Sequence, residues 1–456
     1  MNRIASRSVA ILILAAMLVG GLGFFIVEYF VNGGKWVLHA GSPHVYSGPN
    51  IGTGIVTDRD GILLLDMSGN RTYAVTQELR KSMLHWLGDR YGYIQAPALP
   101  NYAEEMAGYN SLTGLYSYSG AGQAKLTVSA QIQMAALKAL GDRKGTVAVY
   151  NYKTGEILCA VSTPTYDPDN VPDIEGDTSG AYEGVYMNRF TQSVYIPGSI
   201  FKIVTTAAAL EEIPDIREQT FTCTGVYSYG VDSVTCEYKH GTLNFYSAMA
   251  QSCNCAYAEI VDQLGAETLS KYVKQYQVTQ PVSFDGVTTA AGNFDVANAA
   301  PVQVAWSGIG QHKDQINPCR FLTFMGAIAN NGVTVEPHLV DRITCGGAVT
   351  YKAELGNTGR IMSEETAGEL QTMMRNNVLE KYGAENFPGL TVCAKSGTGQ
   401  VGGEQKSNAM FAGFVTDADY PLAFVVAVED AGYGRHVCVP ILSEVLAVCK
   451  EVLDAA

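Results

Sequence analysis

Three short motifs, far apart in the chain, constrain its fold more than any other feature. They are Ser199-Ile200-Phe201-Lys202, Ser252-Cys253-Asn254 and Lys395-Ser396-Gly397-Thr398. Each motif is a weak signal alone. Together they supply a nucleophile, bases beside it, an amide that can orient a substrate, and a cation on a strand whose glycine lets another backbone approach closely. That combination is the equipment for acyl transfer through a serine ester, and it requires a fold that brings the three segments together.

The first motif reads as the start of a buried helix. Pro197 and Gly198 break the chain before it, and the residues after it are almost all apolar. Ser199 and Lys202 then lie on one helical face. A neutral Lys202 could take the serine proton, and both burial and a second cation, Lys395, favour its neutral form. The helix N-terminus would also favour an oxyanion. The alternative, a capping serine with a solvated lysine, suits Ser-x-x-Lys alone but not a lysine in an apolar helix.

The second motif follows a helix-like run, residues 243–251, and reads as a loop or tight helix junction. Ser252 could relay a proton there, and Asn254 could hydrogen-bond an amide of a peptide substrate. An ordinary cap or turn is the alternative, and only the company of the other motifs disfavours it.

The third motif ends a predicted strand, residues 390–399. Gly397 would let the backbone of a ligand approach closely, and Lys395 could hold a carboxylate or tune the lysine of the first motif. Strict alternation puts Lys395 and Gly397 on one face and Ser396 and Thr398 on the other. Alternation alone therefore does not aim all four residues at one ligand, and a glycine-rich hairpin turn is the alternative.

The order and spacing of the three motifs resemble the class B penicillin-binding proteins, and within them the penicillin-binding protein A-like group. The resemblance covers roughly the last three quarters of the chain and fades toward the N-terminus. The segment 52–61 looks like a class B pedestal segment without its leading arginine. Other matching segments are 145–162, 163–168, 307–311 and 327–332.

The resemblance implies a peptidoglycan D,D-transpeptidase that crosslinks stem peptides ending in D-Ala-D-Ala and is acylated by β-lactams. It implies that Ser199 attacks, that Lys202 is the general base, and that Ser252 and Lys395 shuttle the proton. Backbone amides of Ser199 and Thr398 would form the oxyanion hole. Ser396 stands where the family often has threonine, so the hydroxyl is retained. The implied substrate-binding residues are Asn254, Ser396, Gly397 and Thr398.

The N-terminal run 8–27 carries no charge and is long enough to span a bilayer as a helix. Arg3 and Arg7 precede it and Glu28 follows it, so the positive-inside rule places the N-terminus in the cytoplasm and the rest outside. A cleaved signal peptide is the alternative, but no convincing small-x-small cleavage site follows the run. A buried core helix fits such a run at the N-terminus less well.

The chain of 456 residues is expected to form an α+β fold, the serine β-lactamase/transpeptidase-like domain that the resemblance also implies. Strands drawn from 145–162, 390–400, 409–415 and 422–428 would form an antiparallel five-stranded sheet covered by helices, among them 127–140 and 439–453. The central helix would carry Ser199. The expected parts are a cytoplasmic tail (1–7), a transmembrane helix (8–27), a small pedestal region (28–125) and the transpeptidase domain (126–456).

A glycosyltransferase domain is not expected. Fewer than about 100 residues lie between the membrane run and the catalytic domain, and a second enzyme domain normally needs ~100–200 residues. The chain should therefore be monofunctional and depend on a partner that makes glycan strands. By family analogy that partner is a polytopic membrane polymerase. Gly20, Gly21 and Gly23 could form a low ridge for its helices, or could simply be tolerated in a lipid-facing anchor.

Charge and side-chain chemistry bear on the possible partners, disulfides and metal sites of the chain. A net charge of −14 argues against nucleic acid and against an anionic membrane surface as partners. Among the ten cysteines, Cys223 and Cys236 flank a turn-rich stretch and could form a disulfide or stay as free buried thiols. The seven histidines show no metal-ligand spacing, so neither a metal nor a cofactor is expected.

Two other readings of the motifs remain. A D,D-carboxypeptidase or β-lactamase would share the acyl-enzyme chemistry with water as acceptor, but a membrane anchor with a pedestal favours transpeptidation. A β-lactam sensor or a scaffold would not be an enzyme. A sensor usually needs a cytoplasmic output domain, whereas only a handful of residues precede the membrane run here. A scaffold would tend to lose the serine, lysine or glycine of the motifs, and all of them are present.

Overall fold

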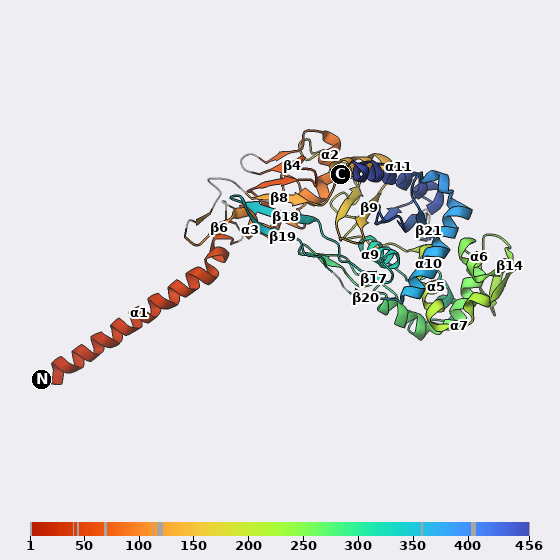
Figure 1. Ribbon diagram of the computed structural model, residues 1–456, viewed down its shortest axis with the longest axis horizontal. Helices are drawn as coiled ribbons and strands as arrows, with labels where there is room; N and C mark the ends of the chain where they lie inside the picture. Colours follow the sequence, from red (N-terminus) through yellow and green to blue (C-terminus); the bar gives the residue numbers. More distant parts are fainter. Residues whose placement is uncertain are drawn as a thin grey trace.

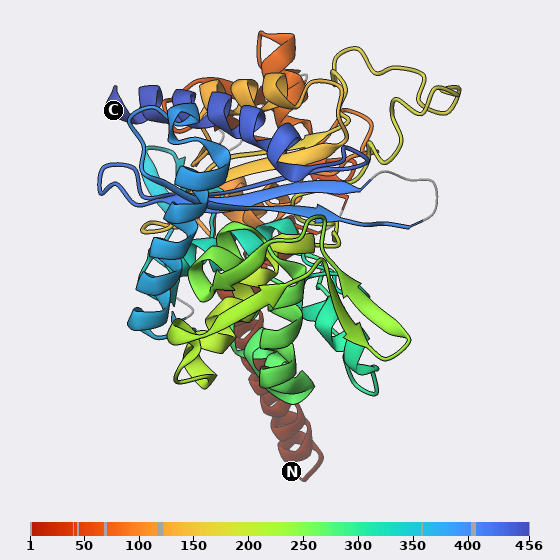
Figure 2. The ribbon, with the colours of Figure 1, turned by 90° about the vertical axis from the view of Figure 1, so that its right-hand side faces the viewer.

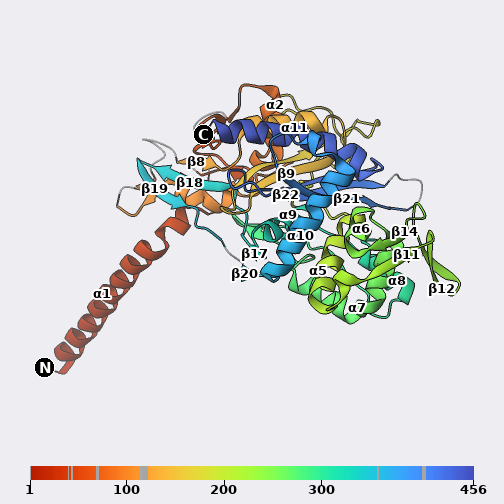
Figure 3. The same cartoon turned by 45° about the vertical axis from the view of Figure 1, so that its right-hand side comes forward.

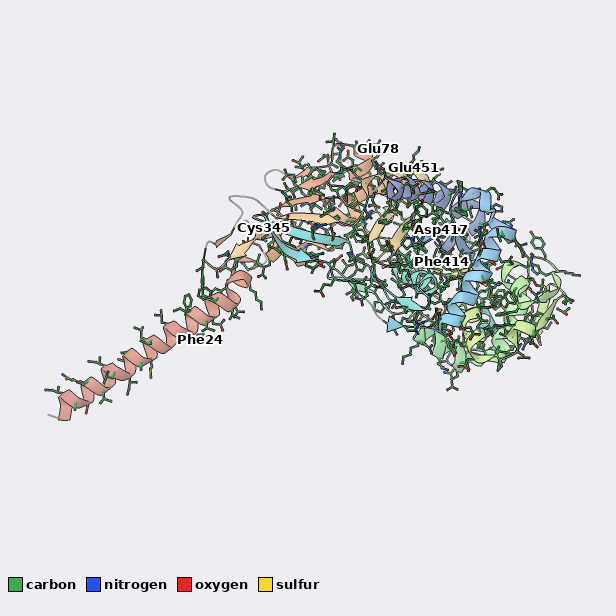
Figure 4. The ribbon with its side chains drawn as sticks, viewed as in Figure 1. Phe24, Glu78, Cys345, Phe414, Asp417 and Glu451 are labelled. Carbon is green, nitrogen blue, oxygen red and sulfur yellow. The ribbon has the colours of Figure 1, made fainter. Side chains whose placement is uncertain are left out.

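The structure, a computed structural model, describes residues 2–39, 41–42, 45–67, 71–112, 114–115, 122–356, 359–402 and 407–455. Helix α1 (Asn2–Val37) projects from the body of the molecule (Figure 1). The part Ile4–Val37 is long and apolar enough to cross a membrane, and its most apolar window is not buried. Figure 4 contrasts Phe24 on this helix with Phe414 inside the body. The predicted run 8–27 thus lies within a longer helix.

A five-stranded antiparallel sheet in the order β10-β9-β23-β22-β21 forms the centre of the body (Figure 2). It confirms the predicted sheet drawn from both ends of the catalytic segment. Its central strand β23 is buried along its whole length, which explains its continuous apolar sequence. The strands are β9 (Gly145–Asn151), β10 (Ile157–Thr163), β21 (Val392–Gly399), β22 (Asn408–Val415) and β23 (Leu422–Val428).

Helices cover both faces of this sheet. Helices α4 (Ala130–Leu140) and α11 (Gly434–Asp454) pack against one face and share a core with it. On the other face α9 (Pro318–Ala329) contacts β22 and β23, while α10 (Glu364–Asn377) contacts β21. The helix predicted from residue 127 begins at Ala130, because the backbone N–H of Thr127 donates to the carbonyl of Leu339 (2.8 Å) and extends sheet pairing.

A second sheet, in the order β19-β18-β8-β3-β4-β5, joins the N-terminal region to the body. Strands β3 and β8 pair in parallel and the other neighbours are antiparallel. Cys345 in Figure 4 marks the sheet near the base of α1. Its strands therefore come from both sides of the predicted boundary at 125/126, which stays a prediction. The strands are β3 (Ile55–Thr57), β4 (Leu63–Asp66), β5 (Thr72–Tyr73), β8 (Gln123–Leu126), β18 (Val340–Cys345) and β19 (Ala348–Lys352).

A helical region with small β-pairs lies at the end of the body away from α1 (Figure 3). Strands β11 and β14 pair with each other, and β12 and β13 form a hairpin. The helix expected within 243–251 begins at Phe245, because the residues before it pair as β14. The elements are α5 (Lys202–Glu212), β11 (Thr220–Cys223), β12 (Val226–Tyr229), β13 (Asp232–Thr235), β14 (Gly241–Asn244), α6 (Phe245–Ala250), α7 (Asn254–Gln275) and α8 (Pro301–Gly308).

Shorter elements complete the described parts of the chain. Helices α2 and α3 pack beside the second sheet. These elements are β1 (Tyr46–Ser47), β2 (Asn50–Ile51), α2 (Gln77–Leu87), η1 (Leu99–Tyr102), α3 (Ala103–Ala107), β6 (Tyr109–Asn110), β7 (Gly114–Leu115), η3 (Gly198–Ile200), η4 (Ile216–Glu218), β15 (Ser283–Phe284), β16 (Val287–Thr288), β17 (Val333–Thr334), β20 (Gly359–Arg360), η5 (Val378–Tyr382) and η6 (Ala384–Asn386).

Candidate active site

Ser199 lies in the short turn η3, directly before α5. The backbone of Gly198 has a φ of +56°, and a Cβ there would meet the carbonyl oxygen of Thr398 at 2.4 Å. Glycine is therefore required for the serine turn to pack against β21. The N–H of Gly198 donates to the carbonyl of Gly310 (2.8 Å), which fixes the turn from a second side. Ser199 itself is half-buried.

Lys202 follows one turn later, at the start of α5, and is completely buried. Its Nζ donates to the carbonyl oxygen of Ser252 (2.6 Å), to Ser252 Oγ (3.2 Å) and to Asn254 Oδ1 (2.7 Å). It also lies 5.2 Å from the centre of the Tyr257 ring. Burial lowers the pKa of Lys202 to about 8. The predicted buried lysine is confirmed, and its amine is within reach of its neutral form near physiological pH.

Lys395 reaches the same hydroxyl from the sheet side. Its Nζ donates to Ser252 Oγ (3.0 Å) and to the carbonyl of Ser396 (3.1 Å). Burial, and next to it the positive charge of Lys202, hold the pKa of Lys395 well below its usual value. Ser252 Oγ thus lies between two amines contributed by different elements.

The second motif is a tight junction between α6 and α7, as predicted. Ser252 has a φ of +53° there. Its backbone N–H donates to the carbonyl of Met249 (3.1 Å). Asn254 opens α7, and its Nδ2 donates to the carbonyl of Thr235 (2.8 Å) at the end of β13. The amide of Asn254 therefore links Lys202 to the β12–β13 hairpin.

The hydroxyls of the third motif have protein partners away from the two amines. Ser396 Oγ lies 3.0 Å from the hydroxyl of Tyr382, which also accepts the backbone N–H of Ser396 (2.9 Å). Thr398 Oγ1 accepts the N–H of Gly434 (3.4 Å). On the other face, Lys395 bonds to the second motif and Gly397 packs against the serine turn, as strict alternation predicts. A contact of Ser396 and Thr398 with a substrate carboxylate stays a prediction.

Gly397 is required by packing within the protein. A Cβ at this position would meet the carbonyl oxygen of Pro197 at 2.3 Å and the side chain of Ile200 at 3.1 Å. The sequence reading assigned this close approach to the backbone of a ligand. In the structure the serine turn itself comes this close to β21.

Gln311 is a site residue to which sequence reasoning assigned no role. Its Nε2 donates to the carbonyl of Thr398 (3.0 Å), and its Oε1 accepts the N–H of Gln400 (3.3 Å). The segment 307–311 contributed to the family resemblance, but nothing in its sequence shows that it braces β21. Only the fold brings Gln311 to this strand.

The arrangement can activate a serine and move its proton. Two buried amines of lowered pKa share one hydroxyl, and Ser199 sits at the N-terminal end of the helix that carries one of them. A neutral amine can accept a proton from a serine, and a hydroxyl between two amines can pass a proton from one to the other. The backbone N–H groups at the helix start can bind an oxyanion.

A group of thiols lies directly beside this site. Cys223 and Cys236 are free thiols in the structure, which is the second of the two alternatives left open by the sequence. Cys236 Sγ instead lies 3.7 Å from Cys253 Sγ. These three cysteines and His240 place donor atoms within 4.8 Å of one another and could hold a metal ion. Histidine spacing did not reveal this group, because the fold adds thiols from β11 and from the start of α7 to Cys236 and His240; that no metal is needed stays a prediction.

The chain is similar to known proteins over most of its length. Residues 145–447 match the family described as the penicillin binding protein transpeptidase domain. The peptidoglycan D,D-transpeptidase PbpA of Mycolicibacterium smegmatis is 27% identical over 68% of this chain and 68% of its own length. Stage V sporulation protein D of Bacillus subtilis is 28% identical over 71% of this chain and 52% of its own length.

The fold is also similar to that of solved structures. Penicillin-binding protein A of Mycobacterium tuberculosis, as a penicillin G acyl-enzyme complex, superimposes with a TM-score of 0.74 at 22% identity, covering 87% of this chain and 99% of that one. At this identity the likeness establishes the fold, which is the predicted transpeptidase-like fold.

Proposed function

The chain belongs to the penicillin-binding protein transpeptidase family, and we propose that it is a peptidoglycan D,D-transpeptidase that crosslinks stem peptides through a serine acyl-enzyme. One observation carries the proposal: Ser252 Oγ lies within hydrogen-bond reach of both Lys202 and Lys395. Lys202 is the first residue of α5, the helix that directly follows the turn with Ser199. The names of the similar mycobacterial PbpA and of the penicillin G complex support the same activity.

In this proposal Ser199 Oγ attacks the carbonyl carbon between the two terminal D-alanines, and neutral Lys202 takes its proton. The backbone N–H groups of Ser199 and Thr398 hold the oxyanion of the tetrahedral intermediate. The intermediate collapses to an ester when the C–N bond breaks. Lys395 and Ser252 pass the proton to the departing D-alanine amine. An acceptor amine then attacks the ester, and Ser199 recovers its proton.

Substrate binding and the β-lactam reaction follow from the same groups. Asn254 would orient the stem-peptide amide, and the strand with Ser396, Gly397 and Thr398 would bind the terminal carboxylate. A β-lactam carbonyl would enter as the donor peptide does and leave Ser199 acylated. The chemistry needs no metal or cofactor in any step.

Labelling with a fluorescent penicillin tests this function. We expect covalent labelling of the full-length protein, mapped by peptide mass spectrometry to Ser199. Ser199→Ala should abolish the label and keep the thermal transition. Ser270→Ala should label normally, because the hydroxyl of Ser270 donates to the carbonyl of Ala266 on the same helix, α7. A label that persists in Ser199→Ala on another residue would refute the assignment.

We further propose that α1 anchors the protein with its N-terminus in the cytoplasm and its catalytic domain outside. The support is the apolar stretch Ile4–Val37 and the arginines before its most apolar part. The proposed parts are those predicted from sequence: tail 1–7, transmembrane helix 8–27, pedestal 28–125 and transpeptidase domain 126–456. Protease added to intact spheroplasts should then degrade the catalytic domain, whereas protection of that domain would reverse the topology.

A monofunctional transpeptidase would need a partner that polymerises glycan strands, and we propose a polytopic membrane polymerase. The helix with Gly20, Gly21 and Gly23 and the pedestal are the parts near the bilayer. A Cβ at any of these glycines meets no atom of the protein within 4 Å. Co-purification of the polymerase with the native protein and with a poly-leucine helix variant would separate contact by the helix from contact by the pedestal.

A further inference from the structure

Three thiols and one imidazole converge where the small β-pairs meet the start of α7. Cys223 ends β11, Cys236 follows β13, His240 precedes β14, and Cys253 is the N-cap residue of α7. One donor atom from each lies within 4.8 Å of the other three. Cys236 and His240 share the connection between β13 and β14, and the fold brings Cys223 of β11 and Cys253 of α7 to them.

Two of the distances within the group match the edges of a metal tetrahedron. Typical Zn–S and Zn–N bonds of ~2.3 Å and ~2.0 Å place two sulfurs ~3.8 Å apart and a sulfur and a nitrogen ~3.5 Å apart. Cys236 Sγ and Cys253 Sγ are 3.7 Å apart, and Cys223 Sγ and His240 Nδ1 are 3.4 Å apart. A disulfide would need a sulfur–sulfur distance of ~2.0 Å. The separation is that of two ligands on one ion.

We propose that Cys223, Cys236, His240 and Cys253 bind one Zn²⁺ ion in a closed structural site. Thiolates and imidazole are the ligands that zinc prefers, and four protein ligands leave no position open for a substrate. Cys223 and Cys253 are buried and the other two half-buried, which suits an ion enclosed by protein. The three thiols lose their protons to solvent when the ion binds.

Backbone groups already favour a thiolate at Cys236. Its Sγ accepts the N–H of Asn254 (3.0 Å) and lies 3.4 Å from the N–H of Cys255. Cys253 Sγ is 3.5 Å from the N–H of Ala256. Such N–H groups at the start of a helix stabilise negative sulfur and orient it toward a metal.

The ion would brace the second catalytic motif. Cys253 lies between Ser252 and Asn254, so one ligand is part of that motif. The other three belong to the segment 223–240, whose strands form two-stranded pairs that are weak by themselves and whose bonds to α7 come from side chains such as Tyr227 and Tyr229. Zinc would tie this segment to the start of α7 and fix the junction that presents Ser252 to the two lysines. The ligands would act as positioning residues.

Metal analysis of the full-length protein, purified in detergent under reducing conditions, tests the site. We expect about one zinc per chain by mass spectrometry of the metal after dialysis. His240→Ala should lose most of it, whereas His240→Cys should keep it by supplying a fourth thiolate. Cys255→Ser removes a neighbouring thiol outside the group of four and should retain the metal.

Measurements on the unsubstituted protein keep the test independent of variant folding. Cobalt exchanged into the site should give the visible d–d bands of a tetrahedral thiolate complex. Wild-type protein that stays free of zinc after incubation with it would overturn the proposal, as would a disulfide between Cys236 and Cys253 in unreduced peptides. Zinc lost from Cys255→Ser but kept by His240→Ala would overturn the ligand set. Metal content does not depend on penicillin labelling, so this proposal and the proposed transpeptidase function can fail separately.

Discussion

Lys202 and Lys395 donate to the same acceptor, the hydroxyl of Ser252, at 3.2 and 3.0 Å. Both amines are almost fully buried, and burial lowers the pKa of each. The charge of Lys202 lowers the pKa of Lys395 further, because two like charges so close in a buried site oppose each other. At least one amine is therefore readily neutral, which is the state that a general base requires.

Replacing Lys202 with arginine should separate its charge from its basicity. Arginine keeps the positive charge but does not deprotonate in proteins. We expect the rate of acylation by a fluorescent penicillin to fall by about 10²–10⁴-fold, the usual contribution of a general base. Stopped-time labelling followed by gel fluorescence measures this rate. Near-normal acylation in Lys202→Arg would mean that Lys202 has only a structural role.

The acylation rate should rise with pH. The pKa of Lys202 is lowered to about 8, so below that pH most of the protein holds the protonated, inactive amine. The rate should increase by about tenfold per pH unit below this value and level off above it. Second-order acylation constants measured across this range give the profile. A flat profile, or one that falls as pH rises toward 8, would contradict a lysine base.

Gly397→Ala should damage both stability and acylation. The added Cβ would lie 2.3 Å from the carbonyl oxygen of Pro197, so β21 and the serine turn must move apart. We expect a loss of about 1–3 kcal/mol in the free energy of unfolding and weak labelling. Gly368→Ala in α10 meets no atom within 4 Å and should gain up to about 1 kcal/mol. Equal stability of the two variants in chemical denaturation would contradict the packing argument.

Much of the fold, and the three motifs that meet at the site, could be predicted from the sequence. Apolar strands such as β23 and the hairpin at Lys153 and Thr154 are local signals, and the strand alternation correctly placed Lys395 apart from Ser396. The group of three thiols and one imidazole that is proposed to bind zinc could not be predicted. The pairing of β11 with β14 brings Cys223 beside His240, and the packing of α7 adds Cys253, so the group depends on tertiary contacts.

The role of Gln311 could not be predicted from the sequence either, because only tertiary packing brings this residue to β21. The contact leads to a further prediction. Gln311→Ala removes the hydrogen bonds to the carbonyl of Thr398 and to the N–H of Gln400. The N–H of Thr398 is proposed to bind the oxyanion, so a looser strand should slow acylation. A net loss of about 0.5–1.5 kcal/mol per hydrogen bond gives about 1–3 kcal/mol for the two bonds, which sets an upper limit of about 150-fold on the rate reduction.

Gln371→Ala is a matched control for Gln311→Ala. The side chain of Gln371 also donates to a backbone carbonyl, that of Ile328 (2.8 Å), but on α10 away from the two lysines. The Gln371→Ala variant should therefore show a larger change in its thermal transition than in its acylation rate. An equal loss of acylation in both variants would show that Gln311 acts only through general stability.

The acyl-enzyme should be long-lived. Among the residues that the structure describes, the groups bonded to Lys202 Nζ, Lys395 Nζ and Ser252 Oγ are amines, an amide and backbone carbonyls, with no carboxylate placed to activate a water. Intact-protein mass spectrometry after removal of excess penicillin should show the penicilloyl adduct persisting long after acylation is complete, and Ser199→Ala should never acquire it. Rapid return to the unmodified mass, with penicillin consumed, would instead identify a β-lactamase, because only efficient hydrolysis of the ester regenerates free Ser199.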